Sequence, residues 1–377
     1  MNFADLLTYA DIDHLKRMAS HYGCERESHS KNGLITSLLY HLGGSSRLRG
    51  ELDSLTPAQF RFLQQLCFDS RKLFSREDLL GKGRSAVDGG EETPRDLLIL
   101  GLRKGWIFPG VTGRNRTLFE VPEDLRQRYL RLFAEVYRGQ GEMSEPAVYR
   151  NEEGLLAEDL HSFLLFLARQ EVRLTQDGAI YRQQQRQILK TFHVDEEPVE
   201  GKGWRFGFGR RYHQYPDRFS LLYDYAYYKG YILEEETEGV LRLSESGLGK
   251  IHNSNHDGEE GRELYRFWLR LYRKPIPRIA VVVKWIDLLA QGGWYRSREV
   301  KKVVGDWLDT YYYETGEDLF QRILKMMLHL GLARIGETSS GEQGLRMNVT
   351  GHRWVSGISG FSDRELDAKY LEVQPRG

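Results

Sequence analysis

The chain has 377 residues, more than one ordinary hydrophobic core can organise, so we expect two to four folding units. Hydrophobic residues make up 40% and charged residues 29% of the chain, which excludes a predominantly disordered protein. Lys and Arg together number 54, as do Asp and Glu, so any nucleic-acid surface has to be a local patch of positive charge.

Residues 1–50 show the pattern of a helical hairpin. An amphipathic stretch at Asp11–Ala19 leads to Gly23, and a second helix contains Leu34–Leu39. This spacing resembles the SAP and Rho-N helical modules, in which a first helix ends at glycine and a second begins near a lysine followed by leucine and isoleucine. In those families the module often binds DNA or RNA, so the resemblance implies that Lys31 contacts nucleic acid. The alternative is a small helical packing unit, because a fold does not carry its function with it.

Residues 51–145 form the first of three expected winged-helix units. Thr56–Phe68 predicts an amphipathic helix with a Thr-Pro start, and Ser75–Leu80 predicts a short capped helix. A third helix ends before Gly105, and a β-hairpin with its turn at Gly110–Arg116 follows.

Residues 146–254 form the second unit. Helices are expected at Leu155–Ala168 and Ala179–Phe192, with a short strand at Val172–Leu174 between them. A third helix ends before Gly230, and a hairpin follows.

Residues 255–360 form the third unit. Its helices are expected at Pro277–Leu289 and Ser297–Leu308, and its third helix ends before Gly331. Beyond it, residues 361–377 form a polar tail with no assigned structure.

The last two units also agree after the hairpin. Leu241–Gly247 (Leu-Arg-Leu-Ser-Glu-Ser-Gly) parallels Leu345–Gly351 (Leu-Arg-Met-Asn-Val-Thr-Gly), as a repeat or as a common strand-exit pattern. The glycine that ends each third helix is expected to form a left-handed cap. A helix, a capping glycine and a hairpin make up the back half of a winged helix-turn-helix. The sequence therefore predicts a mainly α protein with small β-hairpins (α+β), in which an N-terminal helical hairpin precedes tandem winged-helix domains.

The middle hundred residues resemble the accessory regions that precede the motor of XPB-type helicases, and related stand-alone bacterial proteins. Val172–Tyr181, a strand, a glycine turn and the start of a basic helix, carries this resemblance. The phosphate-binding motif of a motor, Gly-x-x-x-x-Gly-Lys-Ser/Thr, does not occur in the sequence. The resemblance therefore implies DNA engagement or partner contact without ATP hydrolysis.

A basic stripe follows in the second unit. Residues 178–194 contain no acidic residue, and cations recur every four positions at Arg182, Arg186 and Lys190, with glutamines between them. This spacing places the three cations on one helix face. A positive stripe suits phosphate oxygens, and Gln or Arg can read base edges. The stripe therefore predicts nucleic-acid binding.

Residues 201–212 combine cations and aromatic residues without an acid. The cations are Lys202, Arg205, Arg210 and Arg211, and the aromatic residues are Trp204, Phe206, Phe208 and Tyr212. Aromatic rings can stack on unpaired bases while arginine neutralises phosphate. The alternative is that alternate rings pack into the core and leave the arginines on the surface. The favoured interpretation has packed rings and cations available to phosphate.

The hairpin tips of the first and third units differ in charge. Arg114 and Arg116 at the first tip are candidates for phosphate contact, and they equally suit a solvated turn. The third turn, Gly336–Glu342, is acidic and would repel phosphate, so this unit is expected to pack or to meet a protein partner. Tyr311–Tyr313 is a candidate interface there, with at least half of it in the core.

No catalytic, metal or cofactor site is expected. His252 and His256 lack a third ligand and fit a polar linker, and Cys24 and Cys67 are too far apart for a disulfide framework or a metal motif, which suits a reducing cytosol. No signal peptide is expected, and the longest aliphatic run, Ile279–Val283, is too short to span a membrane.

Two functions remain open for a protein expected in the cytoplasm. The first is nucleic-acid binding, with DNA favoured over RNA and no catalytic activity, which the basic stripe supports. The second is an adaptor whose winged helices engage a helicase, a polymerase or a second copy of the chain. Zero net charge and the tyrosine-rich third helix around Tyr223–Tyr228 favour the adaptor.

Overall fold

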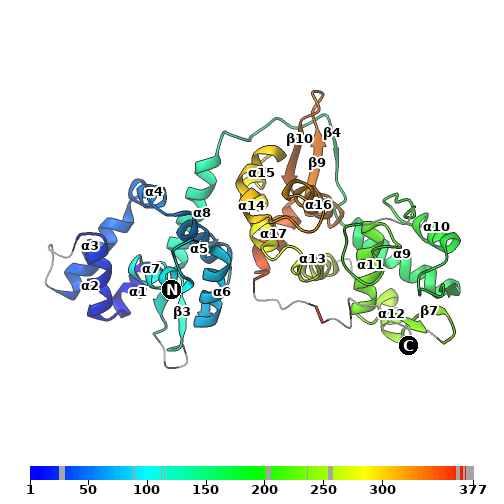
Figure 1. Cartoon of the computed structure of the whole chain (residues 1–377), viewed down its shortest axis with the longest axis horizontal. Helices are drawn as coiled ribbons and strands as arrows, with labels where there is room; N and C mark the ends of the chain where they lie inside the picture. The colour runs from blue at the N-terminus through cyan, green and yellow to red at the C-terminus, as the bar shows by residue number, and fades with distance from the viewer. Residues whose placement is uncertain are drawn as a thin grey trace. The chain divides into compact units, whose positions relative to one another are not determined.

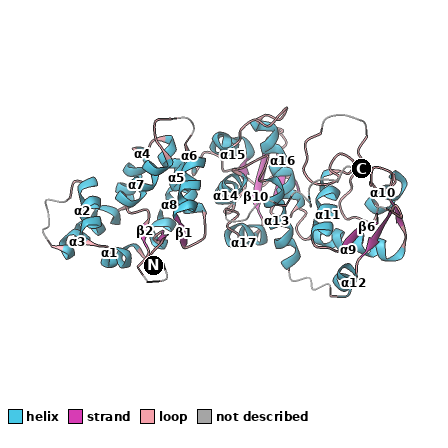
Figure 2. Ribbon diagram, turned by 60° about the horizontal axis from the view of Figure 1, so that its bottom comes forward, coloured by secondary structure: helices cyan, strands magenta, loops and turns pink. Residues whose placement is uncertain are grey.

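The computed structural model describes residues 1–24, 30–87, 90–111, 113, 115–200, 205–235, 237–253, 258–361, 366–367 and 370. Helices dominate (Figure 1), and Figure 2 shows the strands gathered in small sheets, which are antiparallel throughout. This confirms the expected mainly α fold with small β-hairpins. The chain divides into two compact units, unit 1 (Met1–Gln140) and unit 2 (Gly141–Gly377).

Unit 1 begins with a group of packed helices. They are α1 (Phe3–Tyr9), α2 (Ile12–His21), α3 (Lys31–Gly43) and α4 (Ser45–Asp53). Helices α2 and α3 pack together as the expected hairpin. His14 Nε2 lies 2.9 Å from the Leu102 carbonyl oxygen, and the Tyr22 hydroxyl donates to the Lys104 carbonyl at 3.0 Å. These contacts join the hairpin to the rest of unit 1.

The remainder of unit 1 has the order helix–strand–helix–helix–hairpin, which we name copy 1. Its elements are α5 (Pro57–Phe68), β1 (Leu73–Ser75), α6 (Arg76–Ala86), α7 (Pro94–Arg103), β2 (Phe108–Pro109) and β3 (Leu118–Glu120). The strands lie in the order β1-β3-β2. Thr56, Ser75 and Thr93 begin the three helices because each side chain accepts a backbone N–H three positions on. Helix α8 (Glu123–Tyr137) follows and packs against α5.

Unit 2 repeats this order in copy 2 and copy 3. Copy 2 consists of α9 (Leu155–Arg169), β5 (Val172–Arg173), α10 (Arg182–Leu189), α11 (Asp217–Tyr228), β6 (Ile232–Glu235) and β7 (Val240–Leu243), with strand order β5-β7-β6. Helices α12 (Glu245–His252) and α13 (Glu259–Tyr272) follow. Copy 3 consists of α14 (Ile279–Ala290), β8 (Tyr295–Arg296), α15 (Ser297–Val304), the 3₁₀ turn η2 (Gly305–Trp307), α16 (Gly316–His329), β9 (Ala333–Glu337) and β10 (Gln343–Met347), and ends in α17 (Val349–Gly357).

Two predicted helices of unit 2 are shorter than expected. The helix expected at 179–192 begins only at Arg182, because Ile180 forms a β-bridge with Leu174. The helix expected at 297–308 gives way to η2 after Val304.

The third helix of every copy ends in the same way. Gly105, Gly230 and Gly331 each have φ +68°, a left-handed value that favours glycine. The residue after each glycine donates its N–H to the carbonyl five positions back, at 2.9, 2.8 and 2.8 Å. This is the hydrogen bonding of a Schellman cap, and it confirms the predicted left-handed caps.

Residues 141–150 cross the hairpin of copy 3. They end in β4 (Val148–Arg150), which adds to the sheet in the order β4-β9-β10-β8. On the way, Met143 lies over Gly344 and Pro146 over Gly336, and the two glycines are cross-strand partners. A Cβ atom on either glycine would overlap with these side chains, so the bare glycines make room for the crossing segment.

Candidate nucleic-acid interface

Helix α10 presents the predicted cations to solvent. Arg182, Arg186 and Lys190 are all exposed. Ile188 and Leu189 of the same helix are buried, so they orient the helix toward the core of copy 2. The cation stripe expected from the sequence therefore lies on the surface of unit 2.

Two of these cations have no partner within the described chain. The Arg182 guanidinium donates to the Val199 carbonyl at 3.1 Å and lies 3.4 Å from a Glu200 oxygen. The side chains of Arg186 and Lys190 form no hydrogen bond or ion pair with any described residue.

The glutamines of α10 divide between two roles. Gln184 and Gln185 bond to the backbone of the chain that precedes the helix. Gln183 and Gln187 are exposed beside the cations. Only this second pair is available to a ligand.

Three predicted phosphate contacts are held by acidic side chains of unit 2 instead. Arg205 pairs with Asp217. Arg210 and Arg211 both pair with Glu234, at 2.8 and 3.1 Å, and only 6% and 4% of their side-chain surface is exposed. A cation is tolerated in such a buried place only when its charge is matched. Contrary to the expectation, the structure does not offer Arg210 and Arg211 to phosphate.

Asp224 lies beneath this arginine pair. Its Oδ1 accepts the backbone N–H of Arg210 at 3.1 Å, while its Oδ2 has no hydrogen-bond partner among the described residues. A Cβ atom on Gly209, whose φ is +120°, would overlap with Oδ2. Burial raises the pKa of Asp224 to about 8. The carboxyl group is therefore neutral at neutral pH and packs directly against backbone.

The other predicted contacts are dispersed. Lys31 is exposed, and its Nζ donates to the Thr8 carbonyl at 2.8 Å, which links α3 to α1. Arg116 is exposed near the hairpin of copy 1. Arg114 and Lys202 lie outside the described residues.

The third helices of copies 2 and 3 face the interior of unit 2. Every residue from Arg218 to Ala226 of α11 is buried. Arg218 pairs with Asp159 of α9 and lies 3.6 Å from Glu152, which also contacts His329 of α16 at 2.8 Å. These buried charges tie α11 to α16. Of the tyrosines expected to form a recognition surface on α11, Tyr223 and Tyr225 are core residues instead, whereas Tyr227 and Tyr228 are partly exposed.

Helix α7 of copy 1 is different, because one of its faces is open. Arg95, Ile99 and Arg103 follow one another at four-residue spacing and are all exposed. This face was not predicted from the sequence, although its residues recur with a period of four. Among the third helices, it is α7 that presents cations together with an exposed apolar side chain.

Aromatic side chains from two segments meet in unit 2. Phe206 is buried, and the ring centroids of Phe206 and Phe208 lie 6.4 and 5.7 Å from that of Tyr311. Tyr312 and Tyr313 are 81% and 78% exposed. Packing into the core is thus seen for Phe206, and the tyrosine run is divided between packed and exposed residues.

The acidic turn of copy 3 is partly neutralised. Glu342 pairs with Arg296 at 3.0 Å and with Arg298 at 3.1 Å. Arg298 has 68% of its side chain exposed, so this ion pair is weak. Glu337 stays exposed in the same hairpin.

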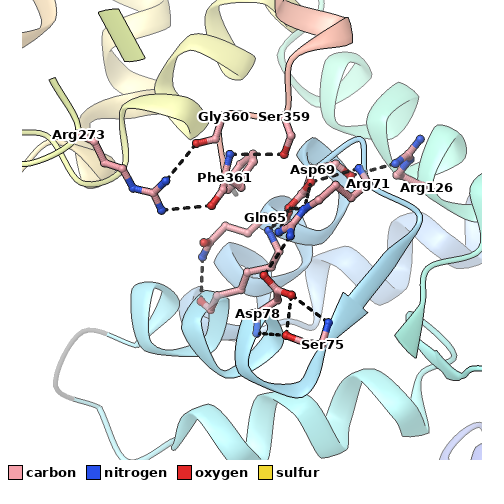
Figure 3. Close-up of polar contacts among 11 residues, drawn as sticks. Gln65, Asp69, Arg71, Ser75, Asp78, Arg126, Arg273, Ser359, Gly360 and Phe361 are labelled. Atoms are coloured by element: carbon pink, nitrogen blue, oxygen red, sulfur yellow. Dashed lines mark hydrogen bonds and ion pairs between the residues drawn. The ribbon is translucent and has the colours of Figure 1, made fainter. Parts of the chain in front are cut away.

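Unit 1 contains a buried polar network that holds α5 to α6 (Figure 3). The buried carboxylate of Asp69 lies 2.8 Å from Arg71 and 2.7 Å from Lys82. Gln65 donates to the Lys82 carbonyl at 3.0 Å. Burial lowers the pKa of Lys82 to about 8. The groups are matched to one another, as a structural network requires.

The described residues show no metal cluster and no membrane span. No three of their His, Cys, Asp and Glu side chains could hold a metal ion, and His256 lies outside them. Cys24 and Cys67 are buried and are not joined in a disulfide. None of the described helices is long and apolar enough to cross a membrane.

Comparison with known proteins found no protein-family model, no curated protein and no solved structure that matches this chain. Its function therefore has to be inferred from the chemistry of its surfaces.

Proposed function

We propose that the chain is a winged-helix protein that binds nucleic acid, DNA first among the candidates, and that α10 contacts the sugar–phosphate backbone. The proposal requires no catalytic activity. Copies 1, 2 and 3 supply the scaffold, since each has three helices and a hairpin in winged-helix order, with the first strand beside the last.

The observation that carries the proposal is the exposed face of α10. It aligns three cations, and neither Arg186 nor Lys190 has an acidic partner among the described residues. Residues 178–194 contain no acidic side chain that would repel phosphate. A helix with such a face binds phosphate by charge and by release of counterions.

The buried third helices indicate the mode of binding. In helix-turn-helix proteins the third helix usually enters the major groove and reads bases. Helix α11 is buried along almost its whole length, so unit 2 has no such helix to offer from copy 2. Backbone contacts position a protein without reading sequence, so we expect binding with little sequence preference.

The test is a fluorescence-anisotropy titration of the full chain with labelled DNA and RNA at two salt concentrations. The variant Arg182→Gln/Arg186→Gln/Lys190→Gln should bind more weakly and should reduce the slope of log affinity against log salt by about 2 to 3 on duplex DNA. The control replaces three exposed cations of unit 1, Lys16→Gln/Arg17→Gln/Arg49→Gln, and should keep the wild-type slope. Absence of binding by the wild-type chain at low salt, or equal losses in both variants, would overturn the proposal.

A second candidate is an adaptor function, and one observation favours it. Helices α11 and α16 already serve as protein-packing surfaces within unit 2, since Arg218 of α11 and His329 of α16 both contact Glu152. A chain that uses winged helices in this way can use the open face of α7 for another protein. An adaptor would show no salt-dependent binding to DNA or RNA.

The proposal includes a cytoplasmic location. Cys24 and Cys67 are both buried outside any disulfide, and burial raises the pKa of Cys67 above its usual value, which keeps the thiol protonated and unreactive. Buried thiols of this kind suit a reducing compartment.

A further inference from the structure

Tyr312 and Tyr313 form the tip of a tight turn between η2 and α16. Tyr311 and Glu314 exchange two backbone hydrogen bonds across it, at 3.0 and 2.9 Å. Tyr312 has φ +51°, a value that such turns usually give to Gly or Asn. Among the described residues it is the one non-glycine residue with a positive φ.

The two rings at this tip are exposed, and the Tyr312 ring meets that of Tyr311 edge-on with the centroids 4.8 Å apart. Tyr312 is 81% exposed and Tyr313 is 78% exposed, so neither ring fills the core. A left-handed backbone is unfavourable for a bulky side chain, and strain of this kind gathers at ligand-binding positions. The strained turn therefore presents two exposed aromatic rings to solvent.

The base of the turn is rigidly mounted. Glu314 is buried and accepts two hydrogen bonds from Arg322, at 2.7 and 2.9 Å. The Arg322 guanidinium carbon in turn lies 4.9 Å from the centre of the Phe206 ring. Rings that are held in place before a ligand arrives lose less conformational entropy on binding.

The segment between α10 and α11 adds further rings beside this turn. The rings of Phe208 and Tyr212 are stacked with their centroids 6.4 Å apart, and the ring centroids of Tyr212 and His213 are 3.8 Å apart. The ring centroids of Phe208 and Tyr311 are 5.7 Å apart. His213 is exposed, and burial together with Arg205 lowers its pKa, so the imidazole is neutral at neutral pH.

This aromatic surface is physically linked to the start of α10. The Arg211 guanidinium donates to the Asp177 carbonyl at 2.7 Å, and the Tyr215 hydroxyl accepts the Ile180 N–H at 2.9 Å. Tyr181, which is 51% exposed, comes next in the chain and is followed by Arg182. The rings and the cation stripe are thus carried by segments in direct contact.

We propose that this aromatic patch stacks on unpaired bases, so that the ligand of unit 2 is single-stranded nucleic acid. The patch consists of Phe208, Tyr212, His213, Tyr311, Tyr312 and Tyr313. The inference rests on the proposed function and narrows its ligand. Flat rings on a segment that contacts the residues just before the cation-bearing helix match a single strand, which offers bare base faces and a charged backbone together, whereas a duplex hides its base faces.

Side-chain chemistry favours bases over a protein partner. In the described parts of residues 190–216 and 305–315, the exposed large hydrophobic residues are Tyr312 and Tyr313, with no aliphatic side chain among them. Stacking on tyrosine tolerates every base, which agrees with the absence of a base-reading helix in copy 2.

The test compares a labelled single strand and a duplex, each of about 20 nucleotides in length, which exceeds the usual site of one binding module. The full chain is titrated as wild type and as Tyr312→Asn/Tyr313→Ser. The control variant, Tyr9→Ser/Tyr40→Ser, removes two tyrosines of unit 1 that are 60% and 68% exposed. All are checked for their fold by circular dichroism and thermal unfolding.

The variant Tyr312→Asn/Tyr313→Ser, the tip variant, should lose at least about fivefold in affinity for the single strand and less than about twofold for the duplex. The salt slope should not change, since no phosphate contact is lost. Tyr312→Asn alone should leave the thermal midpoint unchanged or raised, because Asn adopts a positive φ more readily than Tyr. A merely structural tyrosine would lower it.

Two outcomes separate this inference from the proposed function. If the wild type binds and the α10 variant loses binding while the tip variant binds normally, the stacking inference alone is overturned. If the wild type binds neither single strands nor duplexes at low salt, the proposed function fails and the inference falls with it. Equal losses on both ligands would also overturn the stacking inference.

Discussion

Ser244 and Asn348 make the same contact in two copies of one structure. The Ser244 hydroxyl donates to the carbonyl of Gly230 at 2.6 Å, and the Asn348 amide donates to the carbonyl of Gly331 at 2.9 Å. The backbone N–H of each residue also donates, at 2.9 Å in both copies, to the carbonyl of the residue after the glycine. The match between the two segments in the sequence therefore corresponds to a shared arrangement of hairpin exit and helix cap.

The surroundings of these two glycines predict different costs for the same substitution. A Cβ atom on Gly230 meets nothing within 4 Å, whereas on Gly331 it would lie 2.7 Å from the Cα of Glu153. Gly230→Ala should lower the free energy of unfolding by about 1–2 kcal/mol, the cost of a left-handed alanine. Gly331→Ala should cost more, because the backbone at Glu153 has to shift as well.

Urea unfolding of the full chain measures both costs. Gly249→Ala is the control, since this glycine lies inside α12 with nothing within 4 Å of its Cβ position. That change should be neutral or stabilising by up to about 1 kcal/mol, as alanine favours a helix. Equal costs at Gly230 and Gly331 would contradict the steric argument.

Arginines that look alike in the sequence should respond differently to substitution. Arg210→Gln leaves the buried Glu234 with half of its charge pairing, so the free energy of unfolding should fall by about 3 kcal/mol. Arg186→Gln removes an exposed charge and should change stability by less than about 0.5 kcal/mol.

The two substitutions should rank in the opposite order by their effect on nucleic-acid binding. Arg186→Gln should weaken nucleic-acid binding and its salt dependence, whereas Arg210→Gln should leave the salt slope unchanged when the folded fraction is held constant. Thermal unfolding and anisotropy titration of both variants give the comparison. A loss of salt slope in Arg210→Gln at constant fold would show that this arginine reaches the ligand after all.

Asp224 predicts a pH dependence of stability. Burial raises its pKa from the ordinary value of about 3.8 to about 8 in the folded chain. Between about pH 4 and pH 8 the unfolded chain therefore binds fewer protons than the folded chain, and this carboxyl group lowers stability as the pH rises. The slope is at most about 1.4 kcal/mol per pH unit.

Asp224→Asn removes this titration, because an amide cannot ionise. The free energy of unfolding of the variant, measured relative to wild type, should therefore increase from about pH 5 to about pH 8. Urea unfolding at several pH values checks it, with Asp309→Asn as the control, whose carboxylate is 69% exposed. A constant difference between Asp224→Asn and wild type over this range would contradict a buried, protonated carboxyl group.

The sequence by itself determined the local features of this protein. The capping glycines, the Thr56 and Ser75 starts and the stripe on α10 follow from residues within one or two helical turns of each other. Hydrophobic period, capping chemistry and turn residues act over these short distances, so the pattern alone predicts them. The mainly α fold and the helices and hairpin of each copy came from the same signals, whereas the strand before the second helix was predicted only in copy 2.

Only the tertiary structure decided which charged and aromatic residues remain available. Arg210 and Arg186 both belong to acid-poor basic segments, yet the Arg210 side chain is buried and paired with Glu234, which lies 24 residues further along the chain. In the same way, packing between distant segments buries α11, leaves one face of α7 exposed and places Tyr312 on a strained turn at the surface. Burial and ion pairing depend on which surfaces meet in three dimensions, and no local pattern in the sequence carries that information.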